Sequence, residues 1–271
     1  MYLAHWGLSR SPFGGHLDPA LFLASASHEE ALARLLFLVD HRRRLGLLLG
    51  GRGSGKSTVL EVLASRLRKS GVEVVTAGLL GMDDAEFVWT VATQLGYHPA
   101  GGPARLDLWR SIRDRLTENR YQQLATVLLL EDVDEAPRDV LTSIARLAQL
   151  DHRPESRLTL VLSCQAERMS YLGPRLRELC ELRIELDAWI ESDTAEFLAA
   201  SLAQCGCPRP VFTPEAAARL HARAAGVPRR VVQLAELSLV AAAGQGMDEV
   251  DEETVEAVAE ELSVSSTASL A

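Results

Sequence analysis

The stretch Leu45–Ser57 reads LGLLLGGRGSGKS, and its second part, GGRGSGKS, matches the phosphate-binding pattern GxxxxGK[ST]. Leu45–Leu49 is a short apolar run that ends at glycines, which predicts a buried parallel strand leading into a turn. From Lys56 to Ser70, apolar residues recur on one face of a helix that Gly71 closes. The motif therefore follows a strand and precedes a helix, which is the context that a phosphate-binding loop requires.

The residue types of this P-loop suit a nucleotide and a magnesium ion. Its glycines let the backbone turn several N–H groups toward one point at a helix N-terminus, where phosphate oxygens are favoured. We expect Lys56 to reach the β- and γ-phosphates of ATP and the hydroxyl of Ser57 to bind Mg²⁺. The predicted nucleotide-binding residues are Gly50, Gly51, Arg52, Gly53, Ser54, Gly55, Lys56, Ser57 and Thr58.

An acidic cluster ends a second apolar run, VLLLEDVD at Val127–Asp134. Carboxylates at the carboxyl end of a strand lie where ligands bind in open α/β sheets. In one register Glu131 binds Mg²⁺ and Asp132 polarises the attacking water; shifted by one residue, Asp132 binds the metal and Asp134 is the base. We favour the first register, because four apolar residues already bury the strand before Glu131 and a charge within its buried part would be costly.

Strand and helix signals alternate up to Asp187 and then only helix signals continue. Strands are predicted at Leu45–Leu49, Val72–Ala77, Thr126–Leu130, Leu158–Ser163 and Leu182–Leu186. Helices are predicted from a capping box at Ser27–Glu30 onward, and at Lys56–Ser70, Ala85–Leu95, Leu106–Arg120, Arg138–Leu150, Asp193–Gln204, Pro214–Ala224, Pro228–Ala243 and Glu252–Leu262. This pattern predicts an α/β fold with a five-stranded, mostly parallel sheet between helices. The expected domains are a core at residues 1–189, with an N-terminal segment and helix at 1–44, a helical lid at 190–262 and a flexible tail at 263–271.

The composition is that of an ordinary globular protein, with 47% hydrophobic and 24% charged residues. No segment reaches the roughly 18 apolar residues of a membrane-spanning helix, and we expect a cytoplasmic protein that is not membrane-embedded. The four cysteines show no metal-ligand spacing. The net charge of -9 gives no general attraction for nucleic acid.

From the P-loop through the acidic strand to GVPRR at Gly226–Arg230, the chain resembles AAA+ ATPases of the general secretion pathway protein A (ExeA-like) type. The opening MYLAHWGLSRSPFGGHLDPALFLASASHEEALARLLF is similar to that family's N-terminal segment. By this likeness Pro12, Phe13 and Phe22 lie near the adenine; the alternative is that they are ordinary core residues. The resemblance implies a P-loop NTPase core of the AAA+ class with a small C-terminal helical lid.

The resemblance also points to residues that sense the γ-phosphate. LTLVLSCQAE at Leu158–Glu167 is similar to the sensor 1 segment, with Gln165 at the polar position and Ser163 as the second candidate. A polar side chain there orients the attacking water. GVPRR is similar to the sensor 2 signature, and Arg229 is the matching arginine, whose guanidinium would make the lid respond to the nucleotide.

Members of this class complete their site with an arginine from a neighbouring subunit. Arg183 matches such an arginine, and Arg175 and Arg177 lie close by in the sequence. A homo-oligomer is therefore expected. The family usually carries aspartate then glutamate at the acidic strand, whereas this chain has Glu131 then Asp132. The shorter Asp132 would lose about one methylene of reach, so slow hydrolysis is expected.

The function implied by the resemblance is an ATPase that binds Mg-ATP and hydrolyses it to drive assembly or remodelling of a protein partner, which the sequence does not identify. One alternative is a nucleic-acid-associated ATP switch similar to transposition-activating ATPases; the acidic net charge disfavours DNA binding. Another is a module that binds nucleotide with little hydrolysis.

Overall fold

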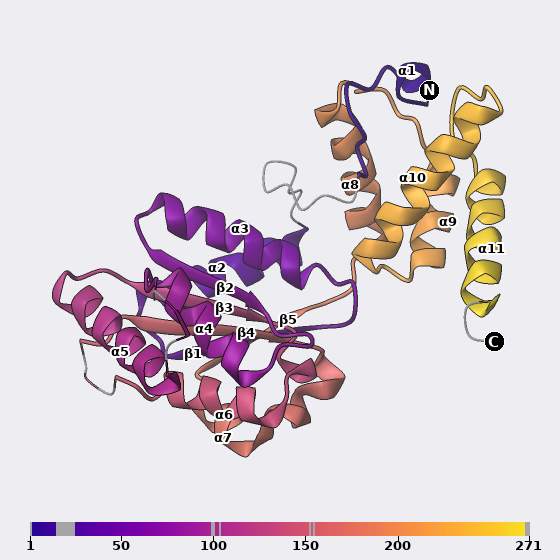
Figure 1. Ribbon diagram of the computed structural model, residues 1–271. Coiled ribbons are helices and arrows are strands. Elements are labelled where there is room, and N and C mark those ends of the chain that lie inside the picture. The colour runs from indigo at the N-terminus through magenta and orange to yellow at the C-terminus, as the bar shows by residue number, and fades with distance from the viewer. Residues whose placement is uncertain are drawn as a thin grey trace. The chain divides into compact units, whose positions relative to one another are not determined.

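The computed structural model describes residues 2–14, 25–98, 101–102, 104–151, 153 and 155–268. The chain divides into two compact units (Figure 1). The α/β unit comprises Glu30–Arg52 and Lys56–Leu186, and the helical unit comprises Met1–Glu29, Gly53–Gly55 and Asp187–Ala271. The tip of the P-loop therefore groups with the helical unit.

The α/β unit is built on a five-stranded parallel sheet, as the sequence predicted. Its strands are β1 (Leu45–Gly50), β2 (Glu73–Gly78), β3 (Thr126–Glu131), β4 (Leu158–Cys164) and β5 (Leu182–Leu186). They lie in the order β2-β3-β4-β1-β5. Leu49 pairs with Cys164 and Leu130 pairs with Leu162, so β1, β3 and β4 end at the same edge. This edge brings the P-loop, the acidic cluster and the sensor 1 segment together.

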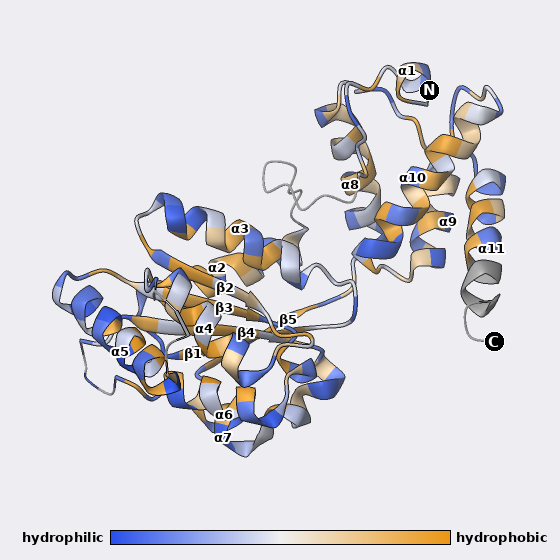
Figure 2. Cartoon of the chain, viewed as in Figure 1, coloured by the Kyte–Doolittle hydropathy of each residue, from blue (hydrophilic) through white to orange (hydrophobic). Residues whose placement is uncertain are grey.

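Helices cover both faces of the sheet. Those of the α/β unit are α2 (Ala26–Asp40), which starts in the helical unit, α3 (Lys56–Lys69), α4 (Asp84–Gln94), α5 (Arg105–Tyr121), α6 (Arg138–Leu147) and α7 (Gly173–Leu179), with short 3-10 turns η2 (Val133–Glu135) and η3 (Ala166–Leu172). Figure 1 shows α2 and α3 on one face and α4 to α7 on the other. Figure 2 shows mainly hydrophobic strands beneath helices with hydrophilic outer faces, as expected for strands buried on both sides.

In the part of the chain that the structure describes, the helical unit packs five helices around its own core. They are α1 (Tyr2–Trp6), α8 (Glu191–Gln204), α9 (Pro214–Ala224), α10 (Pro228–Gly244) and α11 (Glu252–Ala268). Trp6 and Phe13 are buried in this core, and the indole N–H of Trp6 donates to the carbonyl oxygen of Leu239 at 3.0 Å. Residues 2–14 and 25–29 therefore group with the helical unit, whereas the predicted boundary placed them with the core.

Three local features differ from the sequence predictions. The N-terminal cap of α2 is Ser25 rather than Ser27, because the Ser25 hydroxyl accepts from the backbone N–H of His28. The backbone of α11 continues to Ala268, past the predicted end, since no glycine or proline interrupts it. The short helices α1 and α7 were not predicted. Among the described helices, none combines the length and the apolar character that crossing a membrane requires.

Candidate functional site

The P-loop has the backbone shape of a phosphate cradle. Gly53 and Gly55 adopt φ angles of +82° and +95°, which side chains rarely allow. The ammonium group of Lys56 donates to the carbonyl oxygens of Gly50 at 2.8 Å and Gly51 at 2.9 Å. The lysine thus folds back over its own loop, and its charge lies where phosphate oxygens would compete for its hydrogens.

Lys56 is buried, and burial lowers its pKa, while the nearby negative charges of Asp134 and then Asp132 act in the opposite direction. The hydroxyl of Ser54 is also buried and finds no hydrogen-bond partner among the described residues. An orphaned polar atom in a cradle of backbone amides suits a polar ligand. Of the other predicted residues, Ser57 and Thr58 lie half-buried in the first turn of α3, and Arg52 is exposed.

The three acidic residues of the cluster lie in three different environments. Glu131 is the last residue of β3 and is half-buried. Asp132 is exposed, and its φ of +53° turns the chain sharply out of the strand. Asp134 is buried within η2. The strand thus ends at Glu131, as the favoured register requires.

Asp134 is held by the turn that follows β4. One of its carboxylate oxygens accepts from the backbone N–H of Gln165 at 3.4 Å, and the other lies 3.6 Å from the Nε of Arg168. Arg168 also donates to the backbone carbonyl of Asp134 at 3.1 Å. The Asp134 side chain is 1% exposed. This enclosure disfavours the shifted register, in which Asp134 would have to meet water.

The sensor 1 candidates lie at the same edge of the sheet. Ser163 is buried inside β4, whereas Gln165 follows the strand and is half-buried. Gln165 is therefore the better placed of the two to face a ligand. Cys164 lies between them, and burial, helped by the charge of Asp134, raises the pKa of its thiol to about 12. This thiol is accordingly inert at neutral pH.

The three arginine-finger candidates lie away from the P-loop sequence. Arg183 lies within β5, paired in register with Leu47, three residues before the strand ends. Arg175 donates to the side-chain oxygen of Gln149 at 2.9 Å, and Arg177 donates to the carbonyl oxygen of Gly173 at 3.2 Å. Neither of these two hydrogen bonds connects an arginine to the P-loop of the same chain. Their role toward a neighbouring subunit stays a prediction.

Arg229 begins its helix next to the tip of the P-loop. Its backbone N–H donates to the carbonyl oxygen of Gly53 at 3.2 Å, and a β-carbon on Gly53 would lie 3.0 Å from the Cβ of Arg229. The Arg229 side chain is exposed. The GVPRR segment therefore meets Gly53 through a backbone hydrogen bond and through side-chain carbons of Val227 and Arg229, and the Arg229 side chain remains exposed to meet an anion.

The sequence analysis missed His28 and Trp189. Nε2 of His28 lies 3.0 Å from the carbonyl oxygen of Ser54, and Nδ1 lies 2.7 Å from the Ser25 hydroxyl. The indole N–H of Trp189 donates to the same Nδ1 at 3.4 Å. Since a carbonyl only accepts, Nε2 carries the hydrogen and Nδ1 accepts, and burial lowers the pKa of His28. The neutral imidazole thus fixes the loop tip.

A signal for His28 existed in SHEE, part of the opening segment that resembles the family, but its contact with Ser54 spans 26 residues and arises only on folding. Phe13 is buried among aromatic rings of the helical unit, 5.8 Å from Phe197 and 6.3 Å from Phe212 between ring centroids. This favours the core interpretation of Phe13 over an adenine contact. Phe22 lies outside the described residues.

Comparisons with known proteins agree with this geometry. The family model of the AAA domain matches residues 39–172. General secretion pathway protein A of Aeromonas hydrophila is 29% identical over 257 residues, which cover 92% of this chain and 46% of that protein. The chain thus spans less than half the length of this relative.

Solved structures share the fold at low sequence identity. Cdc6p of Pyrobaculum aerophilum has a TM-score of 0.73 at 17% identity, covering 92% of this chain and 70% of that one. The Orc1 protein of Aeropyrum pernix in complex with DNA has a TM-score of 0.67 at 19% identity, and the match covers 93% of this chain and 68% of that one. The Holliday junction branch migration motor RuvB of Thermotoga maritima has a TM-score of 0.61 at 19% identity, and the match covers 92% of this chain and 73% of that one.

These structures establish the fold, and the domain match and the sequence alignment show similarity to AAA-domain proteins and to general secretion pathway protein A. The P-loop, the parallel sheet and the helical unit described above are the parts that such a protein requires. The chain therefore has the AAA+ fold and is similar, over most of its length, to general secretion pathway protein A, as its motifs indicated.

Proposed function

We propose that the chain binds Mg-ATP at its P-loop and hydrolyses it to ADP and phosphate. The observation that carries this proposal is the buried ammonium group of Lys56, held on the carbonyls of Gly50 and Gly51 near the acidic end of β3. In this arrangement a positive charge, a cradle of backbone amides and carboxylates converge. Phosphoryl transfer requires positioning and charge stabilisation of this kind.

The residues present also fit a magnesium ion. The Ser57 hydroxyl follows the loop directly, and Glu131 ends the acidic strand at the same edge of the sheet, so both supply the oxygen ligands that Mg²⁺ prefers. When bound, the ion neutralises charge on the phosphates. We assign Asp132, exposed beyond the strand, to polarising the attacking water. Its short side chain predicts slow turnover.

Three further residues would make hydrolysis depend on conformation and assembly. Gln165, at the end of β4, would orient the attacking water, and Arg229, beside Gly53, would contact the γ-phosphate. Arg183, exposed on the edge strand β5, would serve a neighbouring copy of the chain. The proposal therefore includes an ATP-dependent homo-oligomer.

The cellular task that we infer is assembly or remodelling of a protein partner in the cytoplasm. Its support is the alignment with general secretion pathway protein A, which covers 92% of this chain. A second candidate is a nucleic-acid-associated ATP switch. That candidate is favoured by the likeness to an Orc1 protein in complex with DNA, and the net charge of -9 weighs against it.

The test is a comparison of Lys56→Ala with Lys69→Ala, which removes the same side chain from the far end of α3. Binding of a fluorescent ATP analogue should weaken about 10- to 100-fold in Lys56→Ala only, because a charged hydrogen-bonding group aimed at phosphate is lost. Equal binding by both variants would exclude the P-loop site.

Phosphate release, measured with and without duplex DNA, separates the two candidate functions. Release that is unaffected by DNA supports a protein partner, and release stimulated by DNA supports the switch. Binding without release would identify a nucleotide-binding module that lacks turnover.

A further inference from the structure

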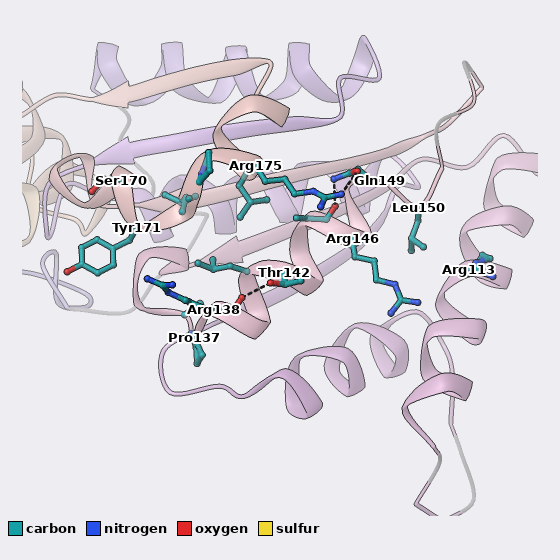
Figure 3. A pocket seen from close by; sticks show the side chains of 17 residues that line it. Arg113, Pro137, Arg138, Thr142, Arg146, Gln149, Leu150, Ser170, Tyr171 and Arg175 are labelled. Atoms are coloured by element: carbon teal, nitrogen blue, oxygen red, sulfur yellow. Dashed lines mark hydrogen bonds between the residues drawn. The ribbon is translucent and has the colours of Figure 1, made fainter.

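A large cleft on the α/β unit lies outside the nucleotide-binding residues. It measures about 1200 Å³ and is formed by α6, by the η3 turn and α7, and by Arg113 of α5 (Figure 3). Its apolar lining includes Leu141, Leu150, Leu172 and Leu176. Most small-molecule pockets have volumes of about 300–1,000 Å³. The cleft is therefore large enough for a segment of another chain.

Arginines surround this apolar lining. Arg138 and Arg146 are eight residues apart on α6, with Thr142 midway, so the three share one exposed face of the helix (Figure 3). Arg175 stands on α7 across the cleft, and Arg113 belongs to α5. The cleft thus presents four cations around an apolar interior.

These cations are not neutralised by the chain itself. Among the residues that the structure describes, no aspartate or glutamate lines the cleft. Within the part of the chain that the structure describes, none of the four arginines pairs with a carboxylate, whereas Arg120 and Arg168 of the same unit do. Arg146 instead lies 3.9 Å from the centre of the Trp109 ring, which fixes its guanidinium in place. In a chain of net charge -9, this is a local concentration of unpaired positive charge.

We propose that this arginine-rimmed cleft docks an acidic amphipathic segment of a partner protein. Apolar side chains of the segment would enter the cleft, and its carboxylates would meet Arg138, Arg146 and Arg175. A helix with carboxylates eight residues apart on one face matches the spacing of Arg138 and Arg146, and helix-in-groove binding is a common recognition mode. The charge complementarity would steer the encounter and set the orientation.

Other occupants fit the cleft less well. Nucleic acid would satisfy the arginines but would leave the leucine-lined interior uncovered. A second copy of this chain would also carry carboxylates, and light scattering tests that occupant below. An acidic partner segment satisfies both the charge and the apolar surface.

The test uses fluorescein-labelled peptides and the full chain without nucleotide. The first peptide is an amphipathic helix with leucines on one face and glutamates flanking it. The second is a scrambled sequence of the same composition, the third carries lysine for glutamate, and a short DNA duplex is the fourth probe. Fluorescence anisotropy should show saturable, salt-sensitive binding of the first peptide only.

Two variants and a control locate the binding. Arg138→Glu with Arg175→Glu reverses two rim charges; both lie in the first turn of a helix, where an anion is favoured, so the variant should fold. Thr142→Trp fills the cleft and keeps every charge. Each should weaken binding by about tenfold or more. Arg68→Glu reverses an exposed arginine on α3, outside the cleft, and should have no effect.

Several results would overturn the proposal. If the acidic helix fails to bind at millimolar concentration, or if the scrambled peptide binds as tightly as the acidic helix, the docking site is excluded. The same holds if Arg68→Glu weakens peptide binding as much as the rim variants do. It also holds if the DNA duplex binds more tightly than the peptide and the rim variants abolish that DNA binding. Light scattering that shows a dimer dispersed by the rim variants would instead assign the cleft to a second copy, which also contradicts the proposal.

The docking site names a class of partner for the remodelling function proposed above. Its role in remodelling therefore rests on that proposed function, whereas the binding of the peptide does not. The two fail separately, because peptide binding is measured without nucleotide. A chain that binds the peptide but not ATP refutes the ATPase alone, and one that binds ATP but not the peptide refutes the docking site alone.

Discussion

Replacing the acids one at a time by their amides should separate three roles at the end of β3. Asp134→Asn should lower the free energy of unfolding by about 2 kcal/mol, the usual cost of losing a buried charged hydrogen-bond partner. The carboxylate accepts from the backbone N–H of Gln165 and faces the Nε of Arg168, and its side chain is 1% exposed. The second carboxylate oxygen accepts no hydrogen bond from the described residues but faces the Arg168 guanidinium, and the NH₂ of an asparagine would place a donor against one of these two groups.

Asp132→Asn is the matched control for stability. Asp132 is exposed, and asparagine tolerates its positive φ, so this variant should unfold like the wild type. Urea denaturation followed by circular dichroism measures both, with an unchanged m-value showing that the denatured state is unaffected. In activity assays Asp132→Asn should bind ATP and lose turnover, whereas Glu131→Gln should weaken metal-dependent binding.

The opposite pattern would refute this reasoning. If Asp134→Asn is as stable as the wild type, binds ATP and does not hydrolyse it, then Asp134 is the base and the shifted register is correct. If all three variants keep full activity, the acidic cluster is not the catalytic edge.

The other predictions concern the P-loop, His28 and the oligomer. Gly55→Ala should abolish ATP binding and cost about 1–2 kcal/mol of stability, since φ is +95° and a β-carbon would lie 2.4 Å from Nε2 of His28. Gly51→Ala, with nothing within 4 Å of its β-carbon, is the control, and equal losses in both would contradict this explanation. Because burial lowers the pKa of His28 below 6.5, its stabilisation is present above pH 6.5 and is lost as pH falls. In urea titrations from pH 7 to 5, the free energy of unfolding should fall less steeply in His28→Gln than in the wild type. Identical pH profiles of the two proteins would count against a buried neutral imidazole. ATP should increase the light scattering of the wild type at tens of micromolar protein but not that of Arg183→Ala, and a wild type that stays monomeric would rule out a shared site.

Much of the fold could be predicted from the sequence because its signals are local. The apolar run Leu182–Leu186 and the helix at Pro214–Ala224 have the predicted bounds, since alternation, apolar runs and a first-turn proline act within a few residues. GGRGSGKS between a strand and a helix determined the P-loop in the same way. The five-stranded parallel sheet is confirmed by the structure.

Only the tertiary structure decided which residues meet from distant parts of the chain. Spacing alone left Asp132 and Asp134 as competing bases, and only folding shows that Asp134 is enclosed beside Arg168 while Asp132 is exposed. His28 reaches Ser54, and Trp6 joins a core built mainly from residues after Asp187. Local hydrogen bonds and periodicity are encoded in neighbouring residues, whereas burial and long-range contacts depend on how complete elements pack, which no single segment determines.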